Sequence, residues 1–168
     1  DGPGMGIALL DYDLDGRLDL YLVRSNRGQE RKTTWLDGPG GPGNQLWRNL
    51  GNWRFEDVTA EVHASGGTRS TITAATLDAN DDGRTDLYVI GEFGPGALLL
   101  NEKTDAGVRF REHRLESEDG DFGSMGLTVG DIDNDGRTDI YTANMYSKAG
   151  RRVIDSLTEG IYEEETFR

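Results

Sequence analysis

Cysteine is absent from this 168-residue sequence, and histidine occurs only twice, at His63 and His113. The lack of cysteine removes disulfide bonds as a source of stability and thiolates as metal ligands. The two histidines stand alone, far from the acidic loops described below. Because zinc and copper favour sulfur and imidazole donors, the composition disfavours sites for either metal.

The sequence also lacks long hydrophobic runs and an excess of positive charge. A membrane-spanning helix needs about 20 consecutive apolar residues, and no run approaches that length. The formal net charge is −13, which opposes binding to nucleic acid and to anionic membrane surfaces. We therefore expect neither nucleic-acid binding nor membrane insertion.

Glycine, by contrast, is abundant, with 24 residues, and hydrophobic residues make up 35% of the chain. Frequent glycine indicates frequent turns. A lean hydrophobic content suits many short, half-buried strands better than thick helices. The composition therefore favours an all-β fold. The sequence begins at Asp1 without an initiator methionine, and we expect it to be a processed or excised piece of a longer protein.

One acidic nine-residue pattern occurs three times. Each copy has a carboxylate or amide at positions 1, 3 and 5, glycine at position 6, arginine at position 7 and aspartate at position 9. The ligand-type residues are Asp11, Asp13, Asp15, Arg17 and Asp19 in the first loop; Asp78, Asn80, Asp82, Arg84 and Asp86 in the second; and Asp131, Asp133, Asp135, Arg137 and Asp139 in the third. Because a turn alone requires no carboxylate at position 9, three in-register copies indicate a shared ligand.

All the candidate metal-ligand atoms in these loops are oxygens. Carboxylates packed into one loop repel one another unless a cation or a proton neutralises them. A flexible loop that offers five or more protein oxygens suits calcium, whereas magnesium retains several of its waters. The sequence therefore predicts calcium as the cofactor, with about three ions per chain. Three divalent ions would change the formal charge from −13 to −7.

An EF-hand loop begins in the same way but needs a bidentate glutamate at position 12 and a helix on each side. Position 12 is Leu22, Val89 or Thr142 here. The flanking segments are instead short and largely apolar, and those that follow the loops are rich in β-branched and aromatic residues, as strands are. They are 6–10 and 19–23, 72–77 and 86–90, and 125–130 and 139–143. Each acidic loop is therefore predicted to connect the two strands of a β-hairpin.

The repeat extends beyond the acidic loops. A second hairpin is predicted at 44–49 and 53–59 after the first loop, and at 97–101 and 108–112 after the second. Units of about four strands are expected at approximately 1–62, 67–115 and 121–168, the last incomplete. The first unit carries an insert of about fifteen residues within 24–43, and 155–168 is too ambiguous to assign.

The third unit resembles the FG-GAP repeat of integrin α-subunit heads and the related bacterial VCBS repeats. The resemblance is carried by 122–141, which reads FGSMGLTVGDIDNDGRTDIY. The segments NQLWRN at 44–49 and RFEDVT at 54–59 are similar to a hairpin of secreted, cartilage-acidic-protein-like proteins. The similarity extends to about Val153. The GAP element is not matched, so the VCBS-type branch is closer and integrin-style ligand binding is not expected.

This resemblance implies a partial β-propeller over 1–168, made of about three four-stranded blades of a ring that is typically seven-bladed. It also implies the ligand set: positions 1, 3, 5 and 9 donate side-chain oxygens, and Arg17, Arg84 and Arg137 donate backbone carbonyl oxygens. Nearly three blades cannot close such a ring. The expected partners are therefore the remaining blades of a parent protein, another protein or further copies of the chain.

No independent catalytic constellation is evident. The segment 38–43 matches the G-x-G-x-x-G pattern, but its two prolines and the lack of a flanking strand and helix argue against a dinucleotide site. Ser70 and Ser124 lack the context of a nucleophile, and neither histidine has a visible serine or cysteine partner. Carboxylates in metal loops are poor proton donors because a bound cation lowers their pKa. We therefore expect a protein that is not an enzyme.

The three tryptophans bear on ligand binding. Trp47 and Trp53 are predicted to pack between strands or blades, whereas Trp35, on the polar insert, is the better candidate for a surface platform.

Two classes of function follow from these observations. The first is a calcium-binding extracellular β-propeller segment that acts as a structural or protein-interaction module. The alternative is a carbohydrate-binding or polysaccharide-lyase-associated propeller with a glycan as partner, and the fold alone does not decide between them. Cytosolic calcium is too low to fill sites of modest affinity, so an extracellular, cell-surface or periplasmic location is expected.

Overall fold

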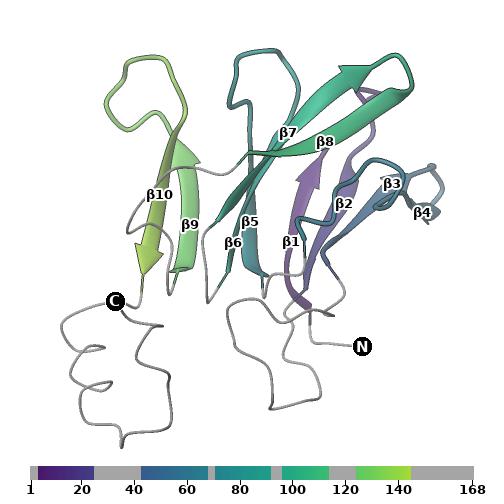
Figure 1. Cartoon of the computed structure of the whole chain (residues 1–168), viewed down its shortest axis with the longest axis horizontal. Coiled ribbons are helices and arrows are strands. Elements are labelled where there is room, and N and C mark those ends of the chain that lie inside the picture. The colour runs from purple at the N-terminus through teal and green to yellow at the C-terminus, as the bar shows by residue number, and fades with distance from the viewer. Residues whose placement is uncertain (1–3, 25–42, 68–70, 92–95, 114–123, 145–168) are drawn as a thin grey trace, which may run out of the picture.

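The computed structural model describes residues 4–24, 43–67, 71–91, 96–113 and 124–144 (Figure 1). All ten elements in these ranges are β-strands, which confirms the predicted all-β fold. Most of the predicted insert, Trp35, Ser70 and the segment 145–168 lie outside the described residues. None of the described elements is a helix with the length and apolar character that a membrane span requires.

The strands form three antiparallel sheets in which neighbours in sequence are neighbours in space. The first sheet contains β1 (Gly4–Leu10), β2 (Asp19–Arg24), β3 (Gln45–Asn49) and β4 (Phe55–Asp57). The second contains β5 (Thr71–Leu77), β6 (Asp86–Gly91), β7 (Ala97–Thr104) and β8 (Gly107–His113). The third contains β9 (Ser124–Gly130) and β10 (Asp139–Asn144). Both predicted hairpins of the first two units are therefore confirmed, as is the first hairpin of the third.

The three sheets stand side by side as the blades of a β-propeller. β1 contacts β5, and β5 in turn contacts β9, so the first strands of the three sheets are adjacent. Figure 1 shows the acidic loops after β1, β5 and β9 at the same end of the molecule. One end of the molecule thus carries all three loops.

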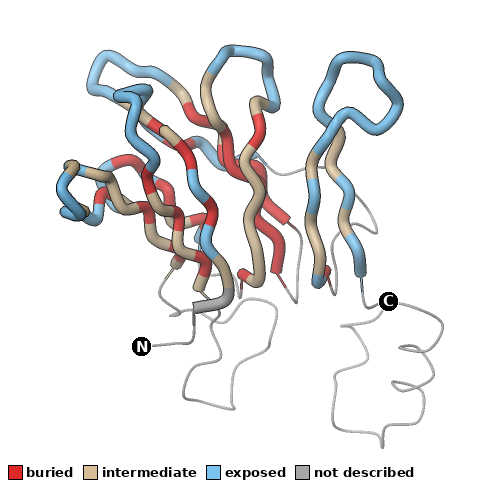
Figure 2. Tube along the Cα trace, turned by 180° about the vertical axis from the view of Figure 1, so that it is seen from behind, coloured by how far each residue is buried: buried red, intermediate tan, exposed pale blue. Residues whose placement is uncertain are grey.

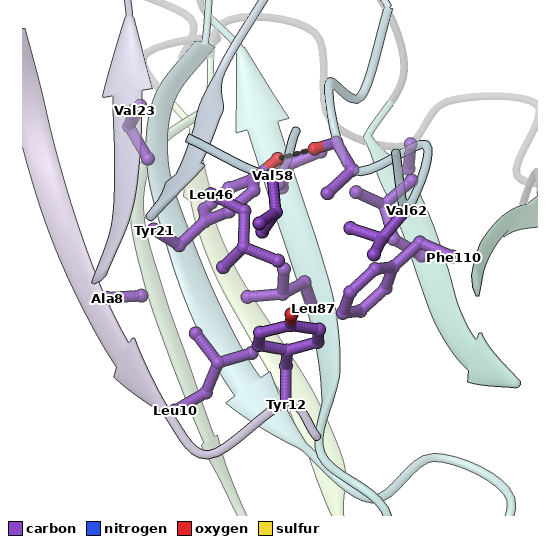
Figure 3. Close-up of a cluster of buried hydrophobic side chains, with 14 residues drawn as sticks. Ala8, Leu10, Tyr12, Tyr21, Val23, Leu46, Val58, Val62, Leu87 and Phe110 are labelled. Atoms are coloured by element: carbon purple, nitrogen blue, oxygen red, sulfur yellow. Dashed lines mark hydrogen bonds between the residues drawn. The ribbon is translucent and has the colours of Figure 1, made fainter. Parts of the chain in front are cut away.

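The core lies between successive sheets. Tyr21 and Leu46 of the first sheet pack in one cluster with Leu87 and Phe110 of the second (Figure 3). The backbone N–H of Phe110 also donates to the Val62 carbonyl at 2.8 Å, which joins β8 to the segment after β4. Burying one such large apolar side chain contributes about 1.5–3 kcal/mol. A second cluster packs Leu77, Tyr88, Ile90 and Leu98 of the second sheet against Leu127 and Ile140 of the third.

Burial along the second strand differs among the three sheets. Every residue of β6 is buried, because the second sheet lies between the other two (Figure 2). Buried and partly buried residues alternate along β2, as expected for a strand covered on one face. β10 has no buried residue among Asp139–Asn144.

One prediction about tryptophan is wrong. Trp53 is 94% exposed, and it lies in the β3–β4 turn, where both Asn52 and Trp53 have positive φ angles, of 52° and 58°. Left-handed backbone at two consecutive residues directs the Trp53 ring away from the sheet, into solvent. Trp47, on β3, is partly buried and lies opposite Leu20, which agrees with its predicted packing role.

Candidate metal loops

The three acidic loops close their hairpins at the same register. Leu10 lies opposite Asp19, Leu77 opposite Asp86, and Gly130 opposite Asp139. Position 1 of each loop then folds the turn, because its two carboxylate oxygens accept the backbone N–H groups of positions 5 and 6. These distances are 3.0 and 2.9 Å for Asp11, 3.1 and 2.8 Å for Asp78, and 3.0 and 2.9 Å for Asp131. The first aspartate of each loop thus stabilises the turn through hydrogen bonds to the loop backbone.

Positions 4 and 6 of each loop adopt the left-handed conformation. At position 6 the φ angles of Gly16, Gly83 and Gly136 are 86°, 80° and 87°, and glycine adopts them without a Cβ penalty. At position 4 the φ angles are 61° for Leu14, 57° for Asp81 and 62° for Asn134. Aspartate and asparagine tolerate this conformation, whereas leucine is strained by roughly 1–2 kcal/mol. The turn conformation therefore explains why position 6 is glycine in all three loops. Leu14 is the one residue at position 4 that is poorly suited to its left-handed conformation.

Position 5 is also held by the loop backbone. Oδ1 of Asp15, Asp82 and Asp135 accepts the N–H of the arginine at position 7, at 2.9, 2.9 and 2.8 Å. The position-3 carboxylates of Asp13 and Asp133 accept the position-5 N–H at 3.3 and 3.1 Å.

The second loop departs from this pattern at position 3. There the Asn80 amide nitrogen donates to Asp82 Oδ2 at 3.1 Å. A cation in this loop would require the Asn80 amide to rotate so that its oxygen faces the ion.

The acidic side chains of two loops converge. Carboxylate oxygens of Asp11, Asp13 and Asp15 lie within 4.8 Å of one another, as do those of Asp131, Asp133 and Asp139. Burial raises the pKa of Asp13, and the neighbouring charges of Asp15 and Asp11 raise it further. The cluster therefore favours a form in which a proton or a cation neutralises it. A cluster of hard oxygen donors fits calcium.

Position 9 has a structural function that the sequence did not reveal. Oδ2 of Asp19 accepts the Tyr12 N–H at 3.2 Å and Oδ1 accepts the Asn49 N–H at 2.8 Å. In the second blade Asp86 accepts the Ala79 N–H at 2.9 Å and the Asn101 N–H at 2.7 Å. Both carboxylates are fully buried, which raises the pKa of each, while the N–H donors oppose that shift. Each therefore ties its loop to the third strand of its blade.

Two asparagines complete these links. Asn49 Nδ2 donates to the Leu18 carbonyl at 2.9 Å, and Asn101 Nδ2 donates to the Thr85 carbonyl at 3.1 Å. Both asparagines lie within the predicted second hairpins, at 44–49 and 97–101, but the sequence alone indicated no role for them. Their recurrence as the fifth residue of the third strand was the signal that could have identified them.

The arginine side chains at position 7 also contact the third strand. Arg17 Nε donates to the Asn49 carbonyl at 2.8 Å, and its Nη2 forms an ion pair with Asp15. Arg84 Nε donates to Asn101 Oδ1 at 3.2 Å. Arg17 thus shares Asp15 with any cation in the first loop.

The structure groups the sequence-predicted ligand residues into three separate loops, one at the end of the first hairpin of each blade (Figure 1). The architecture is thus a set of propeller blades, each with an acidic loop in its first hairpin. The sequence matches the profile of the FG-GAP-like repeat family over residues 11–89 and 78–142. The chain therefore belongs to the FG-GAP-like repeat family.

Curated relatives share the name cartilage acidic protein 1. The Homo sapiens protein is 26% identical over 157 residues, covering 85% of this chain and 22% of the relative. The Xenopus tropicalis protein is also 26% identical over 157 residues, covering 85% of this chain and 23% of the relative. The chain thus spans less than a quarter of the length of these relatives.

Proposed function

We propose that this chain is a calcium-binding segment of an extracellular β-propeller and that it acts as a structural or protein-interaction module without enzymatic activity. The observation that carries this proposal is the repetition of one loop geometry in three blades. The same hydrogen bonds at positions 1, 5 and 6 recur at the same hairpin register in each blade. Each loop also holds three or four acids at ligand positions.

The proposed ligands are the side chains at positions 1, 3, 5 and 9 and the backbone carbonyl at position 7, with about three ions per chain. The charge density supports this set, since a cation would relieve the mutual repulsion of Asp11, Asp13 and Asp15. Ion binding at such loops would rigidify the turns and stabilise the folded state by linkage. An extracellular site provides calcium at roughly 10⁻⁴ to 10⁻³ M, which suits loops of modest affinity. The name of the relatives, cartilage acidic protein 1, agrees with an extracellular location.

The proposed repeat units of this chain are approximately 1–62, 67–115 and 121–168, the last incomplete. The proposed partners are further blades, supplied by the parent protein, another protein or further copies of the chain. Leu87 and Val89, which follow the second loop, are fully buried against the first blade. Leu20 and Leu22 occupy the equivalent positions after the first loop. The corresponding face of the first blade is open, because Ile7 is 66% and Leu9 is 53% exposed. A buried indole N–H on the same face, that of Trp47, lacks a hydrogen-bond partner among the described residues. Another blade would cover this face as the first blade covers the second.

Thermal unfolding in calcium and in chelator tests the calcium proposal. Calcium is expected to raise the melting temperature, and a chain with asparagine at Asp11, Asp78 and Asp131 is expected to lose that increase. Equal melting temperatures of the native sequence in calcium and in chelator would contradict the proposal.

A carbohydrate-binding role is the second candidate, because Trp53 presents a 94% exposed indole on a turn. That turn is fixed by backbone hydrogen bonds from Leu50 to Arg54 at 2.8 Å and from Arg54 to Gly51 at 3.1 Å. A rigid exposed aromatic ring can stack on a sugar. A glycan array probed with the native sequence and with Trp53→Ala tests this role. If Trp53 stacks on a sugar, the native sequence should bind a glycan and Trp53→Ala should lose that binding.

A further inference from the structure

One hydrogen-bond junction connects the first two metal loops to each other. The Tyr12 carbonyl, at position 2 of the first loop, accepts a hydrogen bond from Asn101 Nδ2 of the second blade at 2.8 Å. Arg84 Nη2, at position 7 of the second loop, points to the same carbonyl at 3.5 Å, the outer limit of a hydrogen bond. The Tyr12 carbonyl thus links the first loop to the second, although the two loops start 67 positions apart in the sequence.

Asn101 is the centre of this junction and is fully buried. Its backbone N–H donates to Asp86 at 2.7 Å, and its side-chain nitrogen donates to Thr85 as well as to Tyr12. Its side-chain oxygen accepts Arg84 Nε at 3.2 Å. Asn101 thus contacts positions 7, 8 and 9 of the second loop and position 2 of the first. Because buried polar groups that lose a partner are costly, these bonds form or break together.

On the first loop, the junction fixes a residue between two proposed ligands. Tyr12 stands between Asp11 and Asp13, and its N–H is held by Asp19 at 3.2 Å while its carbonyl is held by Asn101. Its side chain is 2% exposed, and its ring centroid lies 6.4 Å from that of Phe110 in β8 (Figure 3). The backbone of the first loop at position 2 is therefore positioned by the second blade.

We propose that Asn101 is a positioning residue for both loops and that it couples ion binding at the loop starting at Asp11 to ion binding at the loop starting at Asp78. This inference rests on the proposed calcium function. An ion in the second loop orders Arg84, Thr85 and Asp86, which are three of the four contacts of Asn101. The ordered Asn101 then holds the Tyr12 carbonyl in place, so the first loop binds calcium with a smaller ordering cost. Such coupling is reciprocal and is typically worth a factor of 5–150 in affinity.

Asn49 supplies a matched control. It makes the same contacts within the first blade, to Asp19 and Leu18, at 2.8 and 2.9 Å. Among the described residues, however, it has no hydrogen bond to a loop of another blade, as seen from its bonds to Leu18, Asp19, Arg17 and Gly51. Replacing Asn49 therefore disturbs one loop, whereas replacing Asn101 disturbs the link between two.

The test is isothermal titration with calcium on the whole chain, with the third loop disabled by Asp131→Asn and Asp135→Asn. Disabling the second loop as well, by Asp78→Asn and Asp82→Asn, is expected to raise the calcium Kd of the first loop at least about fivefold. In Asn101→Ala, that Kd should be the same whether the second loop is intact or disabled. In Asn49→Ala, the first loop should bind more weakly but still respond to the second loop.

Unfolding by denaturant in chelator gives a readout of folding that does not depend on calcium. If Asn101→Ala fails to fold, Arg84→Leu replaces it, since this variant keeps the position-7 carbonyl and removes the two side-chain bonds that Arg84 donates to Asn101 and Tyr12. It should weaken the coupling. Calcium binding at both loops with no dependence of the first on the second would overturn the coupling while leaving the calcium function standing. No calcium binding at either loop would overturn both.

Discussion

The carboxylate of Asp19 and the backbone N–H of Asn49 form a 2.8 Å hydrogen bond that joins the first acidic loop to the third strand of its blade. The bond is buried on the Asp19 side, where the side chain is fully shielded from solvent. Position 9 therefore contributes to the folded state before any ion arrives. Asp13, at position 3, accepts the Asp15 N–H at 3.3 Å, and within the part of the chain that the structure describes it makes no hydrogen bond to the third strand.

This difference predicts distinct effects of two substitutions. Asp19→Ala should lower the free energy of unfolding in chelator by about 1–3 kcal/mol, because it leaves two buried N–H donors without an acceptor. Asp13→Ala should not destabilise the chelated protein, since it removes a carboxylate whose pKa is raised by burial and by Asp15. In calcium, both variants should be less stable than the native sequence. Urea unfolding with and without chelator measures all four values, and equal losses for the two variants in chelator would refute this division of roles.

The second loop should bind calcium most weakly of the three. It has Asn80 where the other loops have Asp13 and Asp133, so it carries one fewer ligand charge. Its amide nitrogen also faces Asp82 at 3.1 Å and must turn away before the amide oxygen can face an ion. Calorimetry on chains with a single active loop gives the order. Asn80→Asp should tighten the second loop, and a second loop that is already the tightest would show that the ligand positions are assigned incorrectly.

Stability should depend on pH with opposite signs in chelator and in calcium. Burial raises the folded-state pKa of Asp13, Asp19 and Asp86 above the ordinary carboxyl value. As pH falls from neutrality through those raised values, the folded state takes up protons before the unfolded chain does, so the chelated protein becomes more stable. In calcium, protons compete with the ion for the same oxygens, and the stabilisation by the ion is lost over that window.

Thermal melts between pH 7 and about pH 4 in both buffers check these signs. Asp13→Asn should reduce the pH dependence in chelator, since it removes one of the three groups. A chelated protein that loses stability throughout this range would contradict the assignment of raised pKa values to the folded state.

The open face of the first blade should cause association. Leu9 lies opposite Leu20 on this face, and Leu9 is 53% exposed. Leu9→Asp should therefore shift the chain toward monomer in analytical ultracentrifugation with calcium, because a charge opposes burial of the face. Leu14 is similarly exposed, at 55%, but lies in the acidic loop. Leu14→Asn, which introduces the residue found at that position in the third loop, should leave association unchanged. A folded monomer of the native sequence at every concentration would contradict the expectation of further blades.

The sequence predicted the hairpins well because their determinants are local. Each acidic loop encodes its turn within nine residues, and the strands beside it alternate or cluster apolar residues over a short span. The Trp53 prediction failed because the left-handed turn at Asn52 and Trp53, rather than hydrophobicity, sets the direction of the ring. The junction between Asn101 and Tyr12 was out of reach for a different reason. It joins residues 89 positions apart, and only the packing of one blade against the next brings them together.

We propose that each of the three acidic loops binds one calcium ion. Metal analysis of the purified chain after dialysis against millimolar calcium tests it most directly. We expect close to three calcium ions per chain, and close to two after Asp131→Asn and Asp135→Asn disable the third loop. Calcium content that stays near zero, or that does not fall when a loop is disabled, would contradict the claim.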